Sequence, residues 1–200
     1  MSFFETSIIS QLLVISLFSY ILGAIPFALV VSKLKGIDLR SQGSGNLGAT
    51  NVYRIMGVKY AFFVFFMDGL KAFIPTSLSM MYFENPYFHV GVGVIAVLAH
   101  SFTIFASFKG GKGVASSIGM LFALNPIVMG ILLVLGMLII YITRFVSLAS
   151  IVGSFLMPFM MYFFNAPVEY IGVISFISLF VIIRHRSNIL RLIKGTENKI

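Results

Sequence analysis

The sequence predicts an all-α integral membrane protein with seven transmembrane helices, forming a single domain over residues 1–200. Of its 200 residues, 59% are hydrophobic and only 10% are charged, whereas charged residues make up roughly 25% of a typical soluble domain. The apolar residues form runs of about 20, the length that crosses a bilayer as a helix. No linker rich in Pro, Gly or Ser separates these runs, which indicates one domain.

Five apolar runs are each suited to one crossing. They cover residues 7–31, 60–82, 88–107, 145–164 and, in the shortest case, 168–183. A further run, residues 114–142, is too long for one ordinary helix and is interrupted by Asn125-Pro126. The first run predicts a retained helix and not a cleaved signal peptide, because it is long and no small-residue cleavage pattern follows it.

The distribution of Lys and Arg sets the expected orientation. These residues collect in four places: 33–59, 109–112, 144 and 184–199. The positive-inside rule places all four in the cytoplasm, with the acidic Glu5, Glu84 and Glu169 outside. We therefore expect the amino terminus outside and the carboxyl terminus inside. The long run must then cross an even number of times, by a turn at Asn125-Pro126 that gives two crossings or by a re-entrant loop.

Composition also excludes several kinds of site. Cys is absent, which excludes disulfides, thiolate metal sites and a cysteine nucleophile. The net charge of +8 raises nucleic acid as a partner. In a membrane chain, however, basic residues report topology and contact with anionic lipid or an anionic substrate. We therefore expect membrane lipid and small anions as partners, and no nucleic acid.

The first candidate motif is a glycine-rich cytoplasmic segment, Ser41 to Asn51, followed by Arg54. Its glycines fit the pattern G-x-G-x-x-G, but no strand precedes them, so a dinucleotide site is excluded. Closely spaced backbone N–H groups predict instead an anion nest that leads into a helix amino terminus. A flexible loop is the alternative, but it would not require so many amide and hydroxyl groups. Those groups belong to Ser44, Asn46, Thr50 and Asn51.

The second motif, Phe108 to Ser116, places two lysines among glycines at the start of an apolar helix. A Walker A loop requires Ser or Thr after its Gly-Lys pair, and Gly113 follows Lys112, so that type of ATP site is excluded. Unpaired N–H groups at a helix start, together with lysine charge, suit phosphate oxygens. A topology signal alone would explain the lysines but not the glycines.

The third motif joins residues 143–147 to the carboxyl-terminal residues 185–197. His185 and Asn188 are three residues apart, so they share one helix face, and basic side chains surround them. Taken alone, such a segment is more typical of a basic helix that contacts lipid. Its location on the same side of the membrane as the two glycine-rich motifs indicates a site.

Three ionisable residues of the predicted spans are further candidates for the site: Asp68, Lys71 and His100. Asp68 and Lys71 are three residues apart in the second span, where charged groups are costly and are usually paired or functional. We expect either a structural ion pair or a substrate contact. His100, at the cytoplasmic end of the third span, is expected to be a packed or hydrogen-bonded residue and not a base.

Together the motifs resemble those of the bacterial acyl-phosphate:glycerol-3-phosphate acyltransferases of the PlsY type. The likeness covers nearly the whole chain and is carried by Gly43 to Asn51, Phe108 to Ala115, His185 to Ile189 and Lys194 to Glu197. It implies a seven-helix protein of the bacterial inner membrane whose active site faces the cytoplasm. It also implies transfer of a fatty acyl group from acyl phosphate to the 1-hydroxyl of glycerol 3-phosphate in phospholipid synthesis, without a metal or other cofactor.

The resemblance further implies which residues form the site. The expected catalytic residues are Ser44, Asn46, Lys112, Ser147, His185 and Asn188. The expected substrate-binding residues are Gly43, Gly45, Thr50, Asn51, Arg54, Lys109, Gly110, Gly111, Gly113 and Glu197. Since acyl phosphate is already activated, we expect the protein mainly to position both substrates and stabilise developing charge. The donor's own phosphate is expected to accept the proton, with His185 in an orienting role.

The alternative function is a small membrane anion transporter, with Asp68, Lys71 and the Asn125-Pro126 break along its polar pathway. Polar residues instead gather towards one membrane face, and the sequence has no internal repeat. Both observations favour the enzyme. The H-x-x-x-x-D pattern of coenzyme A-dependent acyltransferases follows none of the histidines.

Overall fold

The computed structural model describes residues 3–200 and shows a helical bundle, without a strand in this range. Its elements, in chain order, are α1 (Phe3–Ala24), α2 (Phe27–Leu34), α3 (Ala49–Met56), α4 (Val58–Tyr82), α5 (Pro86–Ser101), the 3-10 turn η1 (Ile104–Ala106), α6 (Val114–Leu124), α7 (Pro126–Thr143), α8 (Val146–Phe163), α9 (Val168–Arg184) and α10 (Arg186–Ile193). The side chain of Glu5, expected outside, is not among those described.

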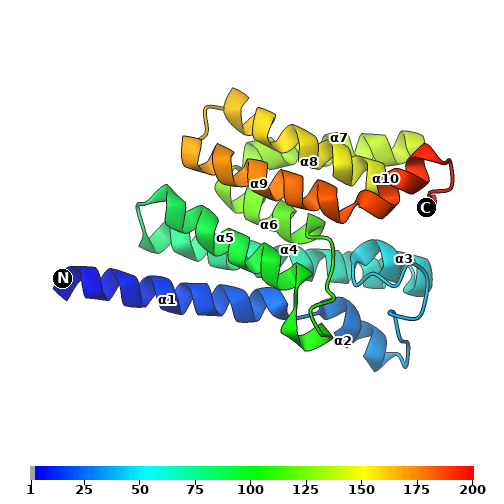
Figure 1. Cartoon of the computed structure of the whole chain (residues 1–200), viewed down its shortest axis with the longest axis horizontal. Helices are drawn as coiled ribbons and strands as arrows, with labels where there is room; N and C mark the ends of the chain where they lie inside the picture. Colours follow the sequence, from blue (N-terminus) through cyan, green and yellow to red (C-terminus); the bar gives the residue numbers. More distant parts are fainter. Residues whose placement is uncertain (1–2) are drawn as a thin grey trace.

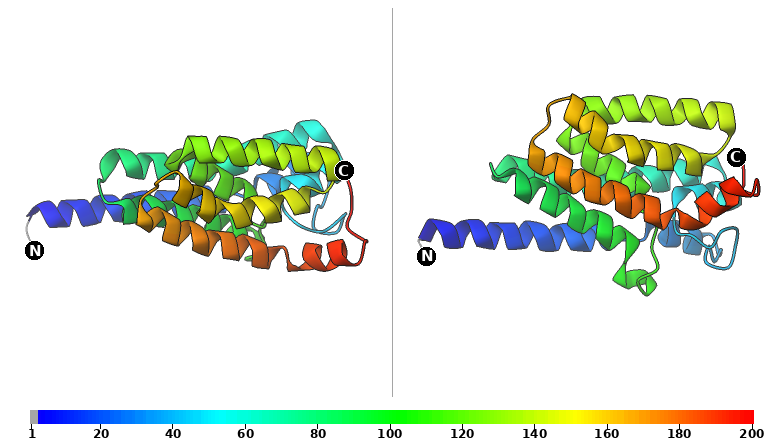
Figure 2. Two further views of the ribbon diagram at one scale, coloured as in Figure 1. Left: turned by 90° about the horizontal axis from the view of Figure 1, so that it is seen from above. Right: turned by 45° about the horizontal axis from the view of Figure 1, so that its top comes forward.

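The long helices run side by side, with α1 at one edge, α4 to α6 in the middle and α7 to α9 at the other edge (Figure 1). The short helices α2, α3 and α10 gather at one end, close to the carboxyl terminus, and the amino terminus lies at the opposite end. Two further views show the same arrangement (Figure 2). All three predicted motifs are therefore carried to one end of the bundle.

The prediction of an integral membrane protein made of helices is confirmed. Within residues 3–200, five helical segments are long and apolar enough to cross a membrane, and the bent pair α9 and α10 makes a sixth. The apolar helix α6 is shorter, at 11 residues. A count of seven spans thus depends on α6, and that count stays a prediction.

The predicted break at Asn125-Pro126 is present. Helix α6 ends at Leu124 and α7 begins at Pro126. The Asn125 side chain accepts a hydrogen bond from the backbone N–H of Val128 at 3.0 Å, which caps α7. Pro126 fits the first helical position because its missing N–H would have no partner there.

The predicted first span, residues 7–31, is present within the helical segment Ser7–Leu34, which is long and apolar enough to cross a membrane. It is, however, interrupted towards its end. Helix α1 ends at Ala24 and α2 begins at Phe27, because Pro26 has no N–H to donate and disfavours helical geometry at Ile25. The backbone oxygens exposed by this break find partners inside the protein. The Lys71 ammonium donates to the Ile25 carbonyl at 3.0 Å, and the Thr103 hydroxyl donates to the Ala24 carbonyl.

Lys71 also lies 2.8 Å from the Asp68 carboxylate, and both side chains are almost completely buried. The ion pair therefore joins α4 to the break between α1 and α2. Of the two roles expected for Lys71, the structural one matches this geometry.

A close approach between α4 and α6 holds the short helix in place. A Cβ atom added at Gly119 would collide with the backbone oxygen of Gly69 on α4. Small residues allow helices in membranes to approach in this way. Since α6 begins at Val114, within the second motif, its tight contact with α4 fixes where that motif lies.

Replacement of Lys71 by Met tests the importance of the break. It would leave Asp68 buried without its partner, and loss of one member of a buried ion pair typically costs about 3–5 kcal/mol. We expect the purified Lys71→Met variant in detergent to have a clearly lower Tm than wild type. Thermal unfolding monitored by circular dichroism measures this. Lys59→Met, at an exposed position of the same helix, is the matched control. Equal Tm values for the two variants would contradict the structural role.

Candidate functional site

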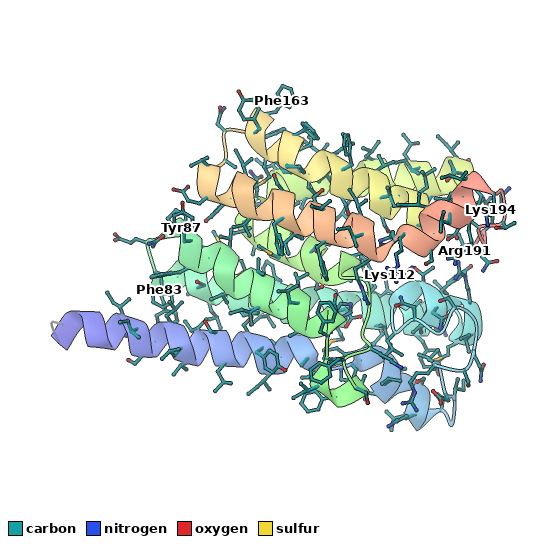
Figure 3. All side chains as sticks on the ribbon, viewed as in Figure 1. Phe83, Tyr87, Lys112, Phe163, Arg191 and Lys194 are labelled. Atoms are coloured by element: carbon teal, nitrogen blue, oxygen red, sulfur yellow. The ribbon has the colours of Figure 1, made fainter. Side chains whose placement is uncertain are left out.

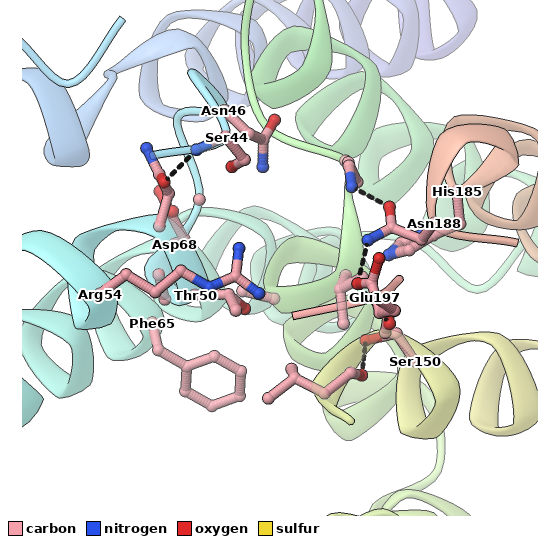
Figure 4. Close-up of a pocket in the computed structure, with 18 of the residues that line it drawn as sticks. Ser44, Asn46, Thr50, Arg54, Phe65, Asp68, Ser150, His185, Asn188 and Glu197 are labelled. Atoms are coloured by element: carbon pink, nitrogen blue, oxygen red, sulfur yellow. Dashed lines mark hydrogen bonds between the residues drawn. The ribbon is translucent and has the colours of Figure 1, made fainter. Parts of the chain in front are cut away.

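A cavity of about 120 Å³ lies at the end of the bundle where the three motifs meet (Figure 4). It is lined by Ser44, Asn46, Gly48, Ala49, Thr50, Asn51, Arg54, Phe65, Asp68, His100, Lys112, Val114, Ala115, Val146, Ser147, Ser150, His185, Asn188, Arg191 and Glu197. Figure 3 shows Lys112, Arg191 and Lys194 towards this end, whereas Phe83, Tyr87 and Phe163 lie towards the other.

The first motif forms a loop that is held from behind by Asn51, in the first turn of α3. The Asn51 side-chain oxygen accepts a hydrogen bond from the Ser44 backbone N–H at 2.8 Å, and its amide donates to the Gln42 carbonyl at 3.2 Å. Gly43 has a φ of 59°, and a Cβ atom there would collide with the Asn51 oxygen. Asn51 lines the cavity, but its side-chain oxygen and nitrogen form hydrogen bonds with the backbone of the loop. The predicted order of glycine loop and then helix is confirmed.

The second motif passes over His100 before α6 begins. A Cβ atom at Gly111 would collide with the His100 ring, and one at Gly110 with the His100 carbonyl. Arg184 donates to the Gly111 carbonyl at 3.1 Å. The loop can follow this path only because residues 110 and 111 are glycines. The same path brings Lys112 into the cavity.

Several predicted residues lie outside the cavity lining. Lys109 is exposed, and Gly43, Gly45, Gly110, Gly111 and Gly113 shape the two loops. Lys71, which is paired with Asp68, does not line the cavity. The remaining predicted residues all line the cavity, including Asp68 and His100, whose Oδ1 and Nδ1 atoms are 3.6 Å apart.

In the third motif, the Glu197 carboxylate gathers three donors. One oxygen accepts from the Ser147 hydroxyl at 2.8 Å and the Asn188 amide at 2.6 Å, and the other accepts from Arg191 at 2.6 Å. Burial opposes the charge, but these hydrogen bonds outweigh it and keep the Glu197 pKa below its usual value. A carboxylate engaged in this way orients its neighbours and does not itself suit an anion.

Lys112 is oriented by the same network, because its ammonium donates to the Asn188 side-chain oxygen. Burial, together with the positive charges of Arg191, Arg184 and Arg54, lowers the Lys112 pKa to about 8, although Glu197 acts in the opposite direction. Lys112 is therefore charged at neutral pH and loses its proton only slightly above it.

His185 lies where α9 and α10 meet at a bend of 57°. Its Nδ1 atom is 2.8 Å from the Val181 carbonyl oxygen, which can only accept, so Nδ1 carries the proton and Nε2 remains an acceptor. Burial, with Lys112 and Arg184 nearby, lowers the His185 pKa to about 4. The imidazole is therefore neutral at pH 7.

Arg54 and the carboxyl-terminal segment close the cavity from opposite sides. Ser44, Asn46 and Arg54 lie on one side, and His185, Asn188 and Glu197 lie on the other (Figure 4). Arg54 spans to the tail by donating to the Asn198 carbonyl at 3.3 Å. The space between them faces donors from both sides, as an anion site requires.

An apolar groove of about 280 Å³ adjoins the cavity between α6, α7 and α8, and the motifs of the sequence did not predict it. Phe65, Val114, Val146 and Ser150 line both the cavity and the groove. Its lining on α7 and α8 repeats at intervals of three and four residues, and this period could have indicated one face of each helix. A site for anions therefore continues into a site for an apolar chain.

The chain is also similar in sequence to known proteins. The family model described as glycerol-3-phosphate acyltransferase matches residues 13–195. Glycerol-3-phosphate acyltransferase of Fusobacterium nucleatum is 45% identical, covering 90% of this chain and 94% of that protein, and the Aquifex aeolicus protein is 41% identical, covering 92% and 96%.

Two solved structures are also similar, both crystal structures of PlsY, an integral membrane glycerol 3-phosphate acyltransferase. The glycerol 3-phosphate form has a TM-score of 0.92 and 40% identity, covering 95% of this chain and 96% of that one. The lysophosphatidic acid form has a TM-score of 0.90 and 39% identity, covering 95% of each chain.

The pKa of Lys112 predicts how anion binding depends on pH. Sulfate, whose charge is constant in this range, should bind more weakly as the pH rises through about 8, because Lys112 loses its proton. Isothermal titration between pH 6.5 and 9 measures this. In Lys112→Met the dependence should vanish, and in Lys109→Met, altered outside the cavity, it should remain. An unchanged dependence in Lys112→Met would rule out this assignment.

Proposed function

The chain belongs to the glycerol-3-phosphate acyltransferase family, and on this premise we propose that it transfers a fatty acyl group from acyl phosphate to the 1-hydroxyl of glycerol 3-phosphate. The products are 1-acylglycerol 3-phosphate and phosphate. The single observation that carries the proposal is the shared wall between the anion cavity and the apolar groove. Two phosphate-bearing substrates, one with an acyl chain, require such a combination. The similar structures are named for a glycerol 3-phosphate form and a lysophosphatidic acid form.

The cavity's donors would divide the two anionic groups between them. Lys112 and Asn188 belong to the side joined to Ser147 and the groove, so we assign them to the acyl phosphate. Asn46 and Arg54, on the facing side, suit the phosphate of the acceptor. Charge that develops on the acyl oxygen and the leaving phosphate would meet Lys112 and backbone N–H groups that are already in place.

The proton of the attacking hydroxyl passes, in this proposal, to the phosphate of the donor. A general base works best with a pKa near the operating pH, and the His185 pKa of about 4 is far below it. The Nε2 lone pair of His185 can still accept a hydrogen bond from a substrate hydroxyl and orient it.

Transfer is proposed to be direct, without an acyl-enzyme. The sequence offered no base beside Ser147, but the structure places the Glu197 carboxylate 2.8 Å from its hydroxyl. That carboxylate has a lowered pKa and already accepts two further hydrogen bonds, which makes it a weak base. Ser147 therefore serves to orient, and since its proton points to Glu197, it offers a lone pair to the substrate.

The placement in the membrane is also proposed. Segments α1 with α2, α4, α5, α6, α7, α8 and α9 would make seven crossings of one domain in the bacterial inner membrane. The amino terminus would be outside, and the cavity would face the cytoplasm. The position of Lys112, Arg191 and Lys194 towards one end supports this orientation (Figure 3). The short α6 crosses only if the bilayer is thinned nearby.

Phosphate release by the purified protein tests the reaction. With acyl phosphate and glycerol 3-phosphate, Lys112→Ala should lower turnover by about 10²- to 10³-fold, the usual loss for one charge-stabilising donor. Lys109→Ala, outside the cavity, should stay close to wild type. Acyl coenzyme A and acyl carrier protein should be inactive as donors.

Three outcomes would contradict parts of this proposal. Comparable rates with acyl coenzyme A would overturn the donor assignment. Full activity of Lys112→Ala would overturn the role of that lysine. A kinetically competent acyl adduct on the protein, detected by mass spectrometry after mixing with acyl phosphate alone, would overturn direct transfer.

Single cysteines in this cysteine-free chain test the sidedness. Lys109→Cys and Arg186→Cys are at exposed positions near the end of the bundle where the three motifs meet. They should react with an impermeant thiol reagent only from the cytoplasm. Glu84→Cys and Pro126→Cys, both exposed, should react only from outside. Labelling of Lys109→Cys and Arg186→Cys from opposite sides would be incompatible with a single cytoplasmic site.

A further inference from the structure

We propose that Gly153 on α8 sets which acyl chain lengths the protein accepts. The inference rests on the proposed function, because it assigns the apolar groove to the acyl chain of the donor. It goes beyond that function by naming the depth at which the chain is discriminated and the residue responsible.

The groove has a defined direction. Its lining residues on α7 run from Ile140 to Met129, and those on α8 run from Val146 to Met157, each with the spacing of a single helix face. The two helices are adjacent and are joined at residues 144–145, so they are antiparallel (Figure 1). Ile140 and Val146 therefore lie near the cavity, and Met129 and Met157 lie at the far end.

The reacting end of the acyl chain is fixed at the mouth of the groove. Val146 and Ser150 line both cavities, and Ser147 lies between them on α8. Val114, which also lines both, begins α6 two residues after Lys112. An acyl phosphate held by Lys112 must therefore direct its chain along α8, from Ser147 towards Met157.

Gly153 stands part of the way along this path. A helix rises about 1.5 Å per residue, so Gly153 lies about 9 Å beyond Ser147. An extended alkyl chain advances slightly less per carbon than a helix does per residue, so this depth corresponds to roughly seven carbons of the acyl chain.

The space at Gly153 is open. A Cβ atom added there would meet no other atom within 4 Å, although the residue lines the groove. A methyl group at this position would therefore enter open space, and a longer side chain would extend from it into the groove. Gly in a helix interior is also less favourable than most residues, so replacement does not weaken the helix itself.

Gly130 provides a matched control. It lies on α7, it also has no atom within 4 Å of an added Cβ, and it is not part of the groove lining. Leu at position 130 therefore makes the same chemical change in a neighbouring helix without entering the path of the acyl chain.

The test compares hexanoyl phosphate with hexadecanoyl phosphate as donors for wild type, Gly153→Ala, Gly153→Leu and Gly130→Leu. In Gly153→Leu, kcat/KM for the sixteen-carbon donor should fall at least about tenfold, the range in which a pocket discriminates single methylene groups. The six-carbon donor should stay within about twofold of wild type. Gly153→Ala should shift the ratio in the same direction but less, and Gly130→Leu should leave it unchanged.

Two outcomes would overturn the inference. One is that the ratio of kcat/KM for the sixteen-carbon donor to that for the six-carbon donor is the same in Gly153→Leu as in wild type. This would mean that the acyl chain leaves the groove before it reaches Gly153. The other is an equal loss with both donors, which would mean a general defect. Failure of the wild-type protein to transfer from either acyl phosphate would instead reject the proposed function.

Discussion

The constraint on which the structure depends is that backbone polar groups within a membrane must find partners inside the protein. The break at Pro26 exposes the carbonyls of Ala24 and Ile25, and Thr103 and Lys71 satisfy them. Lys71 in turn needs a counter-charge at that depth, which Asp68 supplies. The Asp68 carboxylate also lies 3.6 Å from His100, over which the second glycine motif passes. A proline near the end of the first span is thus connected, contact by contact, to the position of the cavity.

Charge at the site follows a related logic. Cationic side chains crowd around the cavity, and each makes the others harder to keep protonated. Glu197 relieves this crowding by pairing with Arg191 and by orienting Asn188 and Ser147. A single carboxylate therefore organises donors for anions, although its own charge has the wrong sign to bind them. Glu197 can play this part because its carboxylate lone pairs already accept hydrogen bonds from Ser147, Asn188 and Arg191.

Local patterns in the sequence predicted the helices, the break at Asn125-Pro126 and the meeting of three motifs at one end. The break at Pro26 follows from the same proline rule, but the long apolar run around it masks the break in the sequence. Other features depend on partners distant in the chain: the hydrogen bond between Ser147 and Glu197 joins residues 50 apart, and that between Lys112 and Asn188 joins residues 76 apart. The groove was missed because its residue types are those of any helix in a membrane, and only packing distinguishes a cavity wall from a lipid contact.

The wall shared by the cavity and the groove has a kinetic consequence. In the proposed reaction the acceptor arrives dissolved in water, whereas the donor arrives dissolved in the membrane. The donor therefore enters the rate law as a mole fraction of the lipid surface and not as a molar concentration. Dilution of the donor by inert lipid or detergent would slow the reaction even when its total amount in the sample is constant. Saturation of the protein with donor then depends on the donor's mole fraction in the membrane and not on its concentration in the whole sample.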